Sequence, residues 1–265
     1  MTGTAGRPPG RRTWVEQVMG MPISVHVRSG ADALFVADAV AEAYGSLRQV
    51  DRIFSLYRVD SQLSELNQGV RALTDCDPLV REVLDLCEQA RELTDGWFDA
   101  LLPGRDGRAA FDPSGLVKGW AAERAAALLA DRGVADFSLN AGGDIVLCGG
   151  NGLPPWRVGV EDPAEPDRLW AVLEVGEAAV ATSGTARRGA HIVNPRSGRA
   201  VAGLVSVTVL GPSLTWADVY ATAAVARGPD NLAWLGGHPG YHALVVDGNG
   251  LVAATPGIPT ALSAS

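Results

Sequence analysis

The sequence predicts an α+β fold, in which helices and antiparallel strands come in separate blocks. Helical patterns dominate residues 31–133, whereas short apolar runs separated by Gly and Pro turns dominate the chain from Asp136 onward. A hydrophobic content of 47% over 265 residues allows a substantial buried core, and 32 Gly and 16 Pro indicate many tight turns. We therefore expect a disordered segment over residues 1–13 and a single folded domain over residues 14–265.

One strand and three helices are expected in the first half of the chain. MGMPISVHVRS (19–29) alternates apolar and polar residues, which predicts a strand. Apolar positions at helical spacing predict a helix over about 31–54, followed by the polar loop SLYRVDSQLSELN (55–67). DPLVREVLDLCEQARELTDG (77–96) and FDPSGLVKGWAAERAAALLADRG (111–133) predict two further helices, each ended by a glycine.

Strands and one more helix are expected over the rest of the chain. DFSLNAGGDIVLCGG, PWRVGVEDP, LWAVLEVG, AHIVNPRSGRAV and VSVTVLGPS predict short strands. TWADVYATAAVARG (215–228) has a helical pattern, and HALVVDGNGLVAATPG (242–257) predicts a hairpin. The turn of that hairpin is expected at Asp247-Gly248-Asn249-Gly250.

The composition argues against several classes of protein. A net charge of −8 and an isoelectric point of about 5.0 disfavour a nucleic-acid binder. Cys76, Cys87 and Cys148 are odd in number and lack metal-ligand spacing, so we expect a reduced compartment with neither zinc nor disulfides. The Arg11-Arg12 pair is not followed by the apolar run of an export signal, and no stretch of about 20 apolar residues occurs. We therefore expect a cytoplasmic protein without a membrane span.

Motifs of several common enzyme classes are absent from the sequence. No G-x-G-x-x-G opens a βαβ unit, and no G-x-x-x-x-G-K-[ST] loop is present. A G-x-S-x-G elbow is also missing, which leaves a serine hydrolase unsupported. Any nucleotide must therefore be held by other means.

The segment FDPSGLVKGWAAER is the first candidate site. Asp112 and Ser114 precede a helix start, Gly115 and Gly119 keep the backbone uncrowded, and Lys118 follows. Free N–H groups at a helix start, together with a lysine, would seat phosphate oxygens. The local alternative is that Ser114 caps the helix and Lys118 is solvated.

Asp218 and Thr222 form the second candidate, because they lie one turn apart on a helix otherwise rich in Ala, Val and Trp. Their oxygen donors suit a hard cation such as Mg²⁺. The alternative is that Thr215 and Asp218 form a capping pair while Thr222 packs inside.

Histidine and aromatic residues complete the candidates. His191 is expected on a strand just before the Asn194-Pro195 turn, where it is either structural or an acid–base group. Tyr57 lies beside a polar loop. The aromatic pair Trp97-Phe98 precedes Asp99, and this arrangement fits either a flat ligand or a core with a capping carboxylate.

Taken in order, these segments resemble the ApbE family of FAD:protein FMN transferases. The resemblance runs from about residue 19 to the carboxyl-terminal region, and its strength lies in the order of eight motifs. These motifs are MGMPISVHV, FSLYRVDSQLSELN, TDGWFDALLPG, FDPSGLVKGWAAER, SLNAGGDI, LPPWRVGVEDP, ATSGTARRGAHIVNPRSGRAV and VTVLGPSLTWADVYATAAVARG. The resemblance implies two closely packed lobes around a flavin cleft.

The resemblance also implies ligands for a magnesium ion and for FAD as substrate. For Mg²⁺ it implies the side chains of Asp218 and Thr222 and the backbone carbonyls of Gly115 and Ala221. For FAD it implies Met19, Tyr57, Trp97, Phe98, Asp99, Asp112, Lys118 and Val193. The Gly142-Gly143-Asp144 turn and Ser183-Gly184 are expected to line the same cleft. His191 matches the histidine implicated in transfer.

Two features depart from the family pattern. Asn194 replaces the usual Asp, which removes a charge near His191, and the segment between Ser183 and His191 is short. The implied reaction is transfer of the FMN part of FAD to a Thr or Ser hydroxyl of an acceptor protein, with release of AMP. A Mg²⁺-dependent FAD pyrophosphatase and a non-catalytic FAD-binding or storage protein are the alternatives. The sequence identifies neither the acceptor, nor Mg²⁺ over Mn²⁺, nor the oligomeric state.

Overall fold

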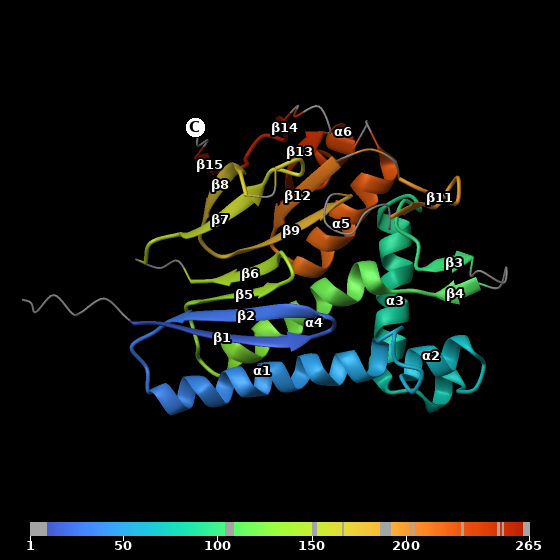
Figure 1. Cartoon of the computed structure of the whole chain (residues 1–265), viewed down its shortest axis with the longest axis horizontal. Helices are drawn as coiled ribbons and strands as arrows, with labels where there is room; N and C mark the ends of the chain where they lie inside the picture. The colour runs from blue at the N-terminus through green and yellow to red at the C-terminus, as the bar shows by residue number, and fades with distance from the viewer. Residues whose placement is uncertain are drawn as a thin grey trace, which may run out of the picture.

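An antiparallel sheet of eight strands runs through the molecule, with helices packed on one of its faces (Figure 1). The computed structural model describes residues 10–103, 109–149, 153–165, 167–185, 192–201, 203, 205–228, 231–247, 250 and 252–261. In spatial order the strands are β1 (Arg11–Val18), β2 (Met21–Arg28), β5 (Phe137–Ala141), β6 (Asp144–Cys148), β9 (Ala178–Gly184), β12 (Val205–Gly211), β13 (His242–Asp247) and β14 (Val252–Ala254). Every neighbouring pair is antiparallel, which confirms the α+β class. The division into two lobes stays a prediction.

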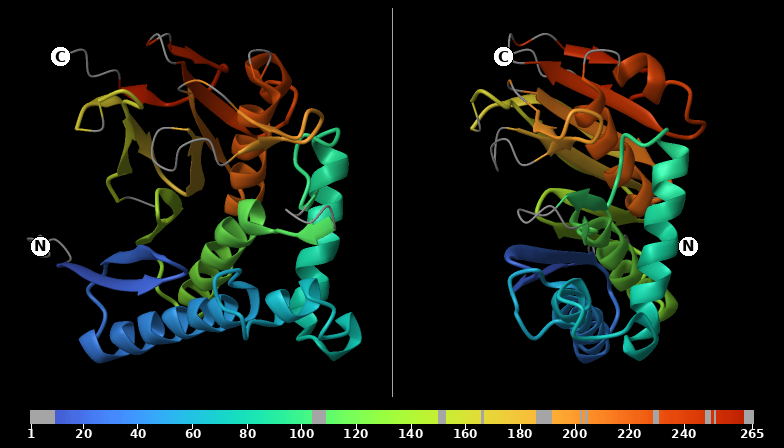
Figure 2. Two further views of the ribbon diagram at one scale, coloured as in Figure 1. Left: turned by 45° about the vertical axis from the view of Figure 1, so that its right-hand side comes forward. Right: turned by 90° about the vertical axis from the view of Figure 1, so that its right-hand side faces the viewer.

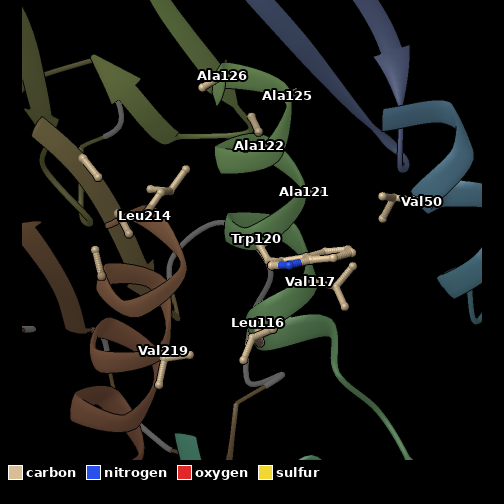
Figure 3. Packing of buried hydrophobic residues seen from close by; sticks show 14 of the residues in the cluster. Val50, Leu116, Val117, Trp120, Ala121, Ala122, Ala125, Ala126, Leu214 and Val219 are labelled. Carbon is tan, nitrogen blue, oxygen red and sulfur yellow. The ribbon is translucent and has the colours of Figure 1, made fainter. Parts of the chain in front are cut away.

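Three long helices make the main core with this sheet. α4 (Ser114–Asp131) packs between α1 (Ala33–Phe54) and α5 (Leu214–Arg227), and α5 also packs on β9 and β12. Figure 3 shows the side chains of α4 directed to both neighbours, with Trp120 on the side of α1 and Leu116 near α5. α4 is apolar and buried on the faces that meet α1, α5 and the sheet, whereas Arg124, Ala127 and Asp131 lie on its exposed side.

Shorter elements complete the helical side of the molecule. α3 (Pro78–Leu93) has an apolar stripe, and its residue Glu82 accepts a hydrogen bond from the Trp120 indole at 3.0 Å. The remaining elements here are α2 (Gln62–Asn67), the 3₁₀ helix η1 (Leu73–Asp75), α6 (Asn231–Leu235), and the small two-stranded sheets β3 (Leu101–Pro103) with β4 (Ala109–Phe111) and β10 (Val193–Asn194) with β11 (Arg199–Ala200).

A second core lies on the opposite face of the eight-stranded sheet. There a three-stranded sheet made of β7 (Trp156–Glu161), β8 (Leu169–Val175) and β15 (Thr260–Ala261) covers it (Figure 2). Leu147 and Val180 from the large sheet pack into one buried cluster with residues of β7 and β8. Alternate residues of the central strands therefore serve two different cores, as the two-residue period of a strand requires.

The predicted helices over 31–54, 77–96, 111–133 and 215–228 are confirmed as α1, α3, α4 and α5. The polar loop predicted over 55–67 is wrong from residue 62 onward, where the short helix α2 forms. Among the described residues, no helix is long and apolar enough to cross a bilayer.

The predicted disordered amino terminus is wrong for residues 11–13, because β1 begins at Arg11 and pairs with β2 along its whole length. The turn between them is formed by Met19 and Gly20, whose φ values of 56° and 72° fit a tight two-residue hairpin. The predicted strand over 19–29 therefore begins at Met21. The predicted turn at 247–250 includes residues 248 and 249, which lie outside the described residues.

Candidate functional site

A cleft of about 1080 Å³ opens beside the amino-terminal end of α4 and one face of α5. Further walls come from the β1–β2 turn, the loop after α1 and the β10–β11 hairpin. The site residues expected from the sequence that line it are Met19, Tyr57, Trp97, Phe98, Asp99, Asp112, Gly115, Lys118, Val193, Asp218 and Thr222. Ala221 is fully buried in α5 and does not line the cleft. The fold thus gathers distant segments at one place, while the ligand roles of these residues stay predictions.

Two glycines let α4 approach α5 closely at the cleft. A Cβ atom on Gly119 would lie 2.9 Å from the Leu214 carbonyl oxygen and 3.0 Å from Asp218 Cβ. A Cβ atom on Gly115 would lie 3.0 Å from Phe98 Cε2 and 3.6 Å from Thr222 Cγ2. Each glycine therefore faces one of the two polar residues of α5. Because the glycines have no side chains, α5 can approach α4 closely enough to bring Asp218 and Thr222 near Lys118.

A buried charge cluster lies where the two helices meet β6. Lys118 Nζ is 2.5 Å from Asp144 Oδ2 and 3.6 Å from Asp218 Oδ1, and the two carboxylate side chains are 0% and 1% exposed. Burial raises the pKa of Asp218 well above its usual range, and the charge of Asp144 raises it further, while Lys118 opposes both. With both carboxylates ionised, the cluster carries a formal charge of −1, and a cation bound here would balance that charge and favour the ionised form of Asp218.

The donor set beside this cluster fits a hard cation. Asp218 Oδ2 is buried and accepts no hydrogen bond from the described part of the chain. Thr222, one turn further along α5, has its Oγ1 3.0 Å from Ser183 Oγ. Carboxylate and hydroxyl oxygens are the ligand types that Mg²⁺ takes, so Asp218 and Thr222 meet the requirement for such an ion.

The capping alternative for α5 is wrong. Ser213 is the N-cap residue, and its Oγ accepts a hydrogen bond from Trp216 N at 3.4 Å. The Thr215 hydroxyl donates to Glu123 of α4. Asp218 is therefore not needed as a cap for this helix.

The capping alternative for α4 is also wrong. The helix begins at Ser114, and Pro113 stands at the N-cap position without a side-chain hydrogen bond. Asp112 Oδ1 accepts from Ser114 N at 3.0 Å. Lys118 is not solvated, since its side chain is 16% exposed and pairs with Asp144.

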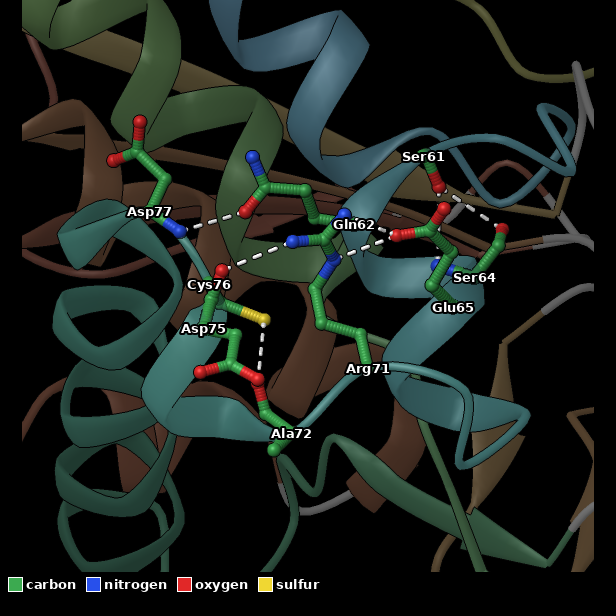
Figure 4. Close-up of polar contacts among 9 residues, drawn as sticks. All are labelled: Ser61, Gln62, Ser64, Glu65, Arg71, Ala72, Asp75, Cys76 and Asp77. Carbon is green, nitrogen blue, oxygen red and sulfur yellow. Dashed lines mark hydrogen bonds and ion pairs between the residues drawn. The ribbon is translucent and has the colours of Figure 1, made fainter.

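The loop after α1 presents Tyr57 at the cleft with a fully exposed side chain. The Ser61 hydroxyl donates to the Ser55 carbonyl at 2.7 Å and closes this loop. The segment that follows is held by further polar contacts (Figure 4), among them Asp77 N donating to Gln62 Oε1 at 2.6 Å. The loop is thus held by hydrogen bonds, while the Tyr57 ring does not pack against the protein. An exposed ring of this kind is free to stack on a ligand.

The aromatic pair at 97–98 divides between core and cleft. Phe98 is buried against Gly115, whereas Trp97 is partly exposed, and the guanidinium of Arg196 lies 4.1 Å from its ring centroid. Asp99 Oδ1 accepts from Leu101 N at 2.8 Å. The core interpretation with a capping carboxylate is therefore confirmed for Phe98 and Asp99, whereas a ligand role for this segment stays a prediction.

His191 lies outside the described residues, so its expected role is neither supported nor opposed by the geometry. The residues that follow it, Ile192 and Val193, line the cleft. Asn194, which stands where the family usually has Asp, donates from Nδ2 to the Ala226 carbonyl at 3.2 Å and accepts from Arg196 N at 3.0 Å. Asn194 therefore fastens the β10–β11 hairpin to the end of α5.

Sequence reasoning missed two carboxylates that organise the site. Glu123 accepts hydrogen bonds from Ser213 Oγ and from the backbone N–H groups of Leu214 and Thr215, which fixes the start of α5. Asp144 was expected only as part of a turn lining the cleft, and its ion pair with Lys118 was not foreseen. Neither pairing has a local sequence signal, because the partners are far apart in the chain.

The fold and the site together define a class of α+β proteins. In this class two helices pack closely at glycine residues, and a lysine–carboxylate cluster between them lies beside a large cleft. A model of the ApbE family matches residues 19–104 and 102–245. The chain belongs to the ApbE family.

Curated relatives carry the name FAD:protein FMN transferase. The protein of Rhodobacter capsulatus is 35% identical over 163 residues, which cover 58% of this chain and 31% of that protein. That of Vibrio cholerae is 36% identical over 131 residues, covering 45% and 39%. The matched part of the chain thus spans less than half the length of these relatives.

Solved structures of the family share the fold. The ApbE protein of Thermotoga maritima has a TM-score of 0.79 at 22% identity and covers 93% of this chain and 97% of its own. Flavin transferase ApbE from Vibrio cholerae has a TM-score of 0.77 at 23% identity, covering 94% and 97%. The agreement extends over nearly the whole chain.

Proposed function

We propose that this protein is a Mg²⁺-dependent FAD:protein FMN transferase, which moves the FMN part of FAD to a Thr or Ser hydroxyl of an acceptor protein and releases AMP. Family membership and the names of the curated relatives support the proposal. The observation that carries it is the buried cluster of Lys118, Asp144 and Asp218 beside Thr222 in a large cleft. Such a cluster suits a ligand that brings a pyrophosphate together with a divalent cation.

The cleft offers separate surfaces for the parts of FAD. Its volume of about 1080 Å³ is at the upper end of the usual range for small-molecule sites, as a dinucleotide requires. Five residues that line the cleft would supply apolar and aromatic surface for the rings: Met19, Tyr57, Trp97, Phe98 and Val193. Asp99 and Asp112 each use one carboxylate oxygen to cap a backbone N–H, and the other oxygen would accept from the ligand.

Asp218, Thr222 and the carbonyl of Gly115, which all belong to residues that line the cleft, would hold the magnesium ion. The carbonyl of Ala221, the fourth ligand that the resemblance implies, belongs to a residue that does not line the cleft. When bound, the ion supplies positive charge that stabilises the pyrophosphate as the reaction proceeds. Lys118 would donate hydrogen bonds to the same phosphate oxygens from its position between the two carboxylates.

The proposed transfer is a displacement at phosphorus. The acceptor hydroxyl oxygen forms a bond to the phosphorus of the FMN half, the bond from that phosphorus to the bridging oxygen breaks, and AMP leaves with the bridging oxygen. His191 would take the hydroxyl proton, a form of assistance worth about 10²–10⁴-fold in rate. A His191→Ala variant that binds FAD and still transfers at the full rate would refute that role.

The proposal is tested by incubating the protein with FAD and Mg²⁺, with and without a peptide that carries an acceptor Thr. We expect AMP together with a peptide heavier by one FMN group, and neither product when EDTA is present. AMP without a modified peptide would indicate an FAD pyrophosphatase instead. FAD that stays bound and intact in every tube would indicate a binding or storage protein.

A further inference from the structure

Lys118 lies closer to one carboxylate of the charge cluster than to the other. Lys118 Nζ lies 2.5 Å from Asp144 Oδ2 but 3.6 Å from Asp218 Oδ1. The ammonium group therefore makes its close ion pair with the carboxylate that does not line the cleft. Asp218, which does line it, has the ammonium only at the longer distance.

We propose that Asp144 is a positioning residue that holds Lys118 away from Asp218 and so leaves the Asp218 carboxylate available to the cation. The inference rests on the cation site of the proposed function. It assigns to Asp144 neither a ligand bond nor a chemical step, only control over where the charge of Lys118 lies.

Asp144 is built to stay in place. It is the first residue of β6, directly after the tight turn at Gly142 and Gly143, where φ is 63° and 106°. Its Oδ1 accepts a hydrogen bond from Thr182 N of β9 at 3.1 Å, and its side chain is 0% exposed. Neighbouring strands therefore fix one oxygen of Asp144 and direct the other at Lys118.

Removing the charge of Asp144 would release Lys118 toward Asp218. A lysine side chain has four rotatable bonds, and the 3.6 Å separation from Asp218 Oδ1 is already within ion-pair distance. Because Nζ is already within reach of Asp218 Oδ1, the released ammonium would pair with Asp218 and compete with the divalent cation. The loss should therefore appear first in cation affinity.

The test uses Mn²⁺, whose free and bound populations are separated by electron paramagnetic resonance, titrated with and without FAD. Asp144→Asn should weaken Mn²⁺ binding about 10- to 100-fold, the usual effect of removing an outer partner of a metal site. The double variant Asp144→Asn/Lys118→Met should regain at least about tenfold, because the competing ammonium is gone. Asp136→Asn is the matched control. Asp136 forms a buried ion pair of 2.8 Å with Arg28, and neither residue lines the cleft, so this variant should change Mn²⁺ affinity less than about twofold.

The comparison of Lys118→Met with the double variant measures the direct effect of losing the negative charge of Asp144 when no lysine is present. The inference predicts that Asp144→Asn weakens Mn²⁺ binding at least about tenfold more in the wild-type background than in the Lys118→Met background. Equal losses in the two backgrounds would overturn it, because Asp144 would then act without Lys118. If Asp144→Asn alone does not fold, a loss of about 100-fold in the Lys118→Met background would overturn it on the same ground. A wild-type protein that binds Mn²⁺ but releases no AMP would refute the proposed function alone, whereas one that binds no Mn²⁺ under either condition would refute both.

Discussion

The close approach of α4 and α5 makes Gly119→Ala the most informative single substitution. A Cβ at this position would meet the Leu214 carbonyl oxygen at 2.9 Å and Asp218 Cβ at 3.0 Å, so one helix must shift. Overpacking of this kind costs about 1–3 kcal/mol, and the better helix propensity of Ala returns up to about 1 kcal/mol. We expect a net loss of stability of up to about 2 kcal/mol.

Gly45→Ala is the matched control, because Gly45 also lies inside a helix but its added Cβ would meet only the end of Arg48 at 3.9 Å. Propensity alone then applies, and we expect a gain of up to about 1 kcal/mol. Urea unfolding of both variants measures the difference, which isolates the cost of the clash at Gly119.

The clash also predicts a functional effect. Since the added methyl group would push directly on Asp218, we expect Mg²⁺-dependent FAD binding by Gly119→Ala to weaken about tenfold, or about 1.4 kcal/mol. Gly45→Ala should bind FAD as the wild type does. A Gly119→Ala protein that is stabilised like Gly45→Ala and binds FAD normally would show that the glycine spacing does not position Asp218.

Three further outcomes follow from contacts outside the cation site. Glu123→Gln should lower the free energy of unfolding by about 1.5–3 kcal/mol, because charge-assisted hydrogen bonds to the start of α5 are lost; no change in a urea titration would contradict this. Burial raises the pKa of Tyr44 to about 12, so between about pH 10 and 12 the unfolded chain binds fewer protons than the folded one. The free energy of unfolding should therefore fall as the pH rises through that window, and it should fall less steeply in Tyr44→Phe. Burial likewise raises the pKa of Cys87 to about 12, so this thiol should resist a disulfide reagent at about pH 8 until the protein is unfolded; rapid labelling of the native protein would show that it is accessible.

Local sequence signals predict most of the helices, because their apolar spacing and stop residues are contained within each segment. The short helix α2 escapes such reasoning, since its six residues are too few to show a period and its cap, Ser61, lies in a polar run. The sequence did not predict strand β1, and one reason is that its first residues, Arg11, Arg12 and Thr13, carry no apolar signal. Their pairing is set by the β2 register instead.

In the candidate site, too, contacts within one helix could be predicted from the sequence, whereas contacts between distant segments could not. The D-x-x-x-T spacing within α5 places Asp218 and Thr222 on one face without any knowledge of the fold. The pairing of Lys118 with Asp144 depends on β6 reaching α4, and Glu123 meets Ser213 across 90 residues of chain. Which carboxylate neutralises the lysine and which remains for a cation is therefore a tertiary property.

The central claim is that the polar stripe of α5 holds a divalent cation against FAD. Anomalous diffraction from crystals grown with FAD and Mn²⁺ tests it most directly. The account predicts one strong peak about 2.1 Å from oxygens of Asp218 and Thr222, with Lys118 still paired to Asp144. A peak elsewhere in the cleft, or none while FAD is bound, would contradict it.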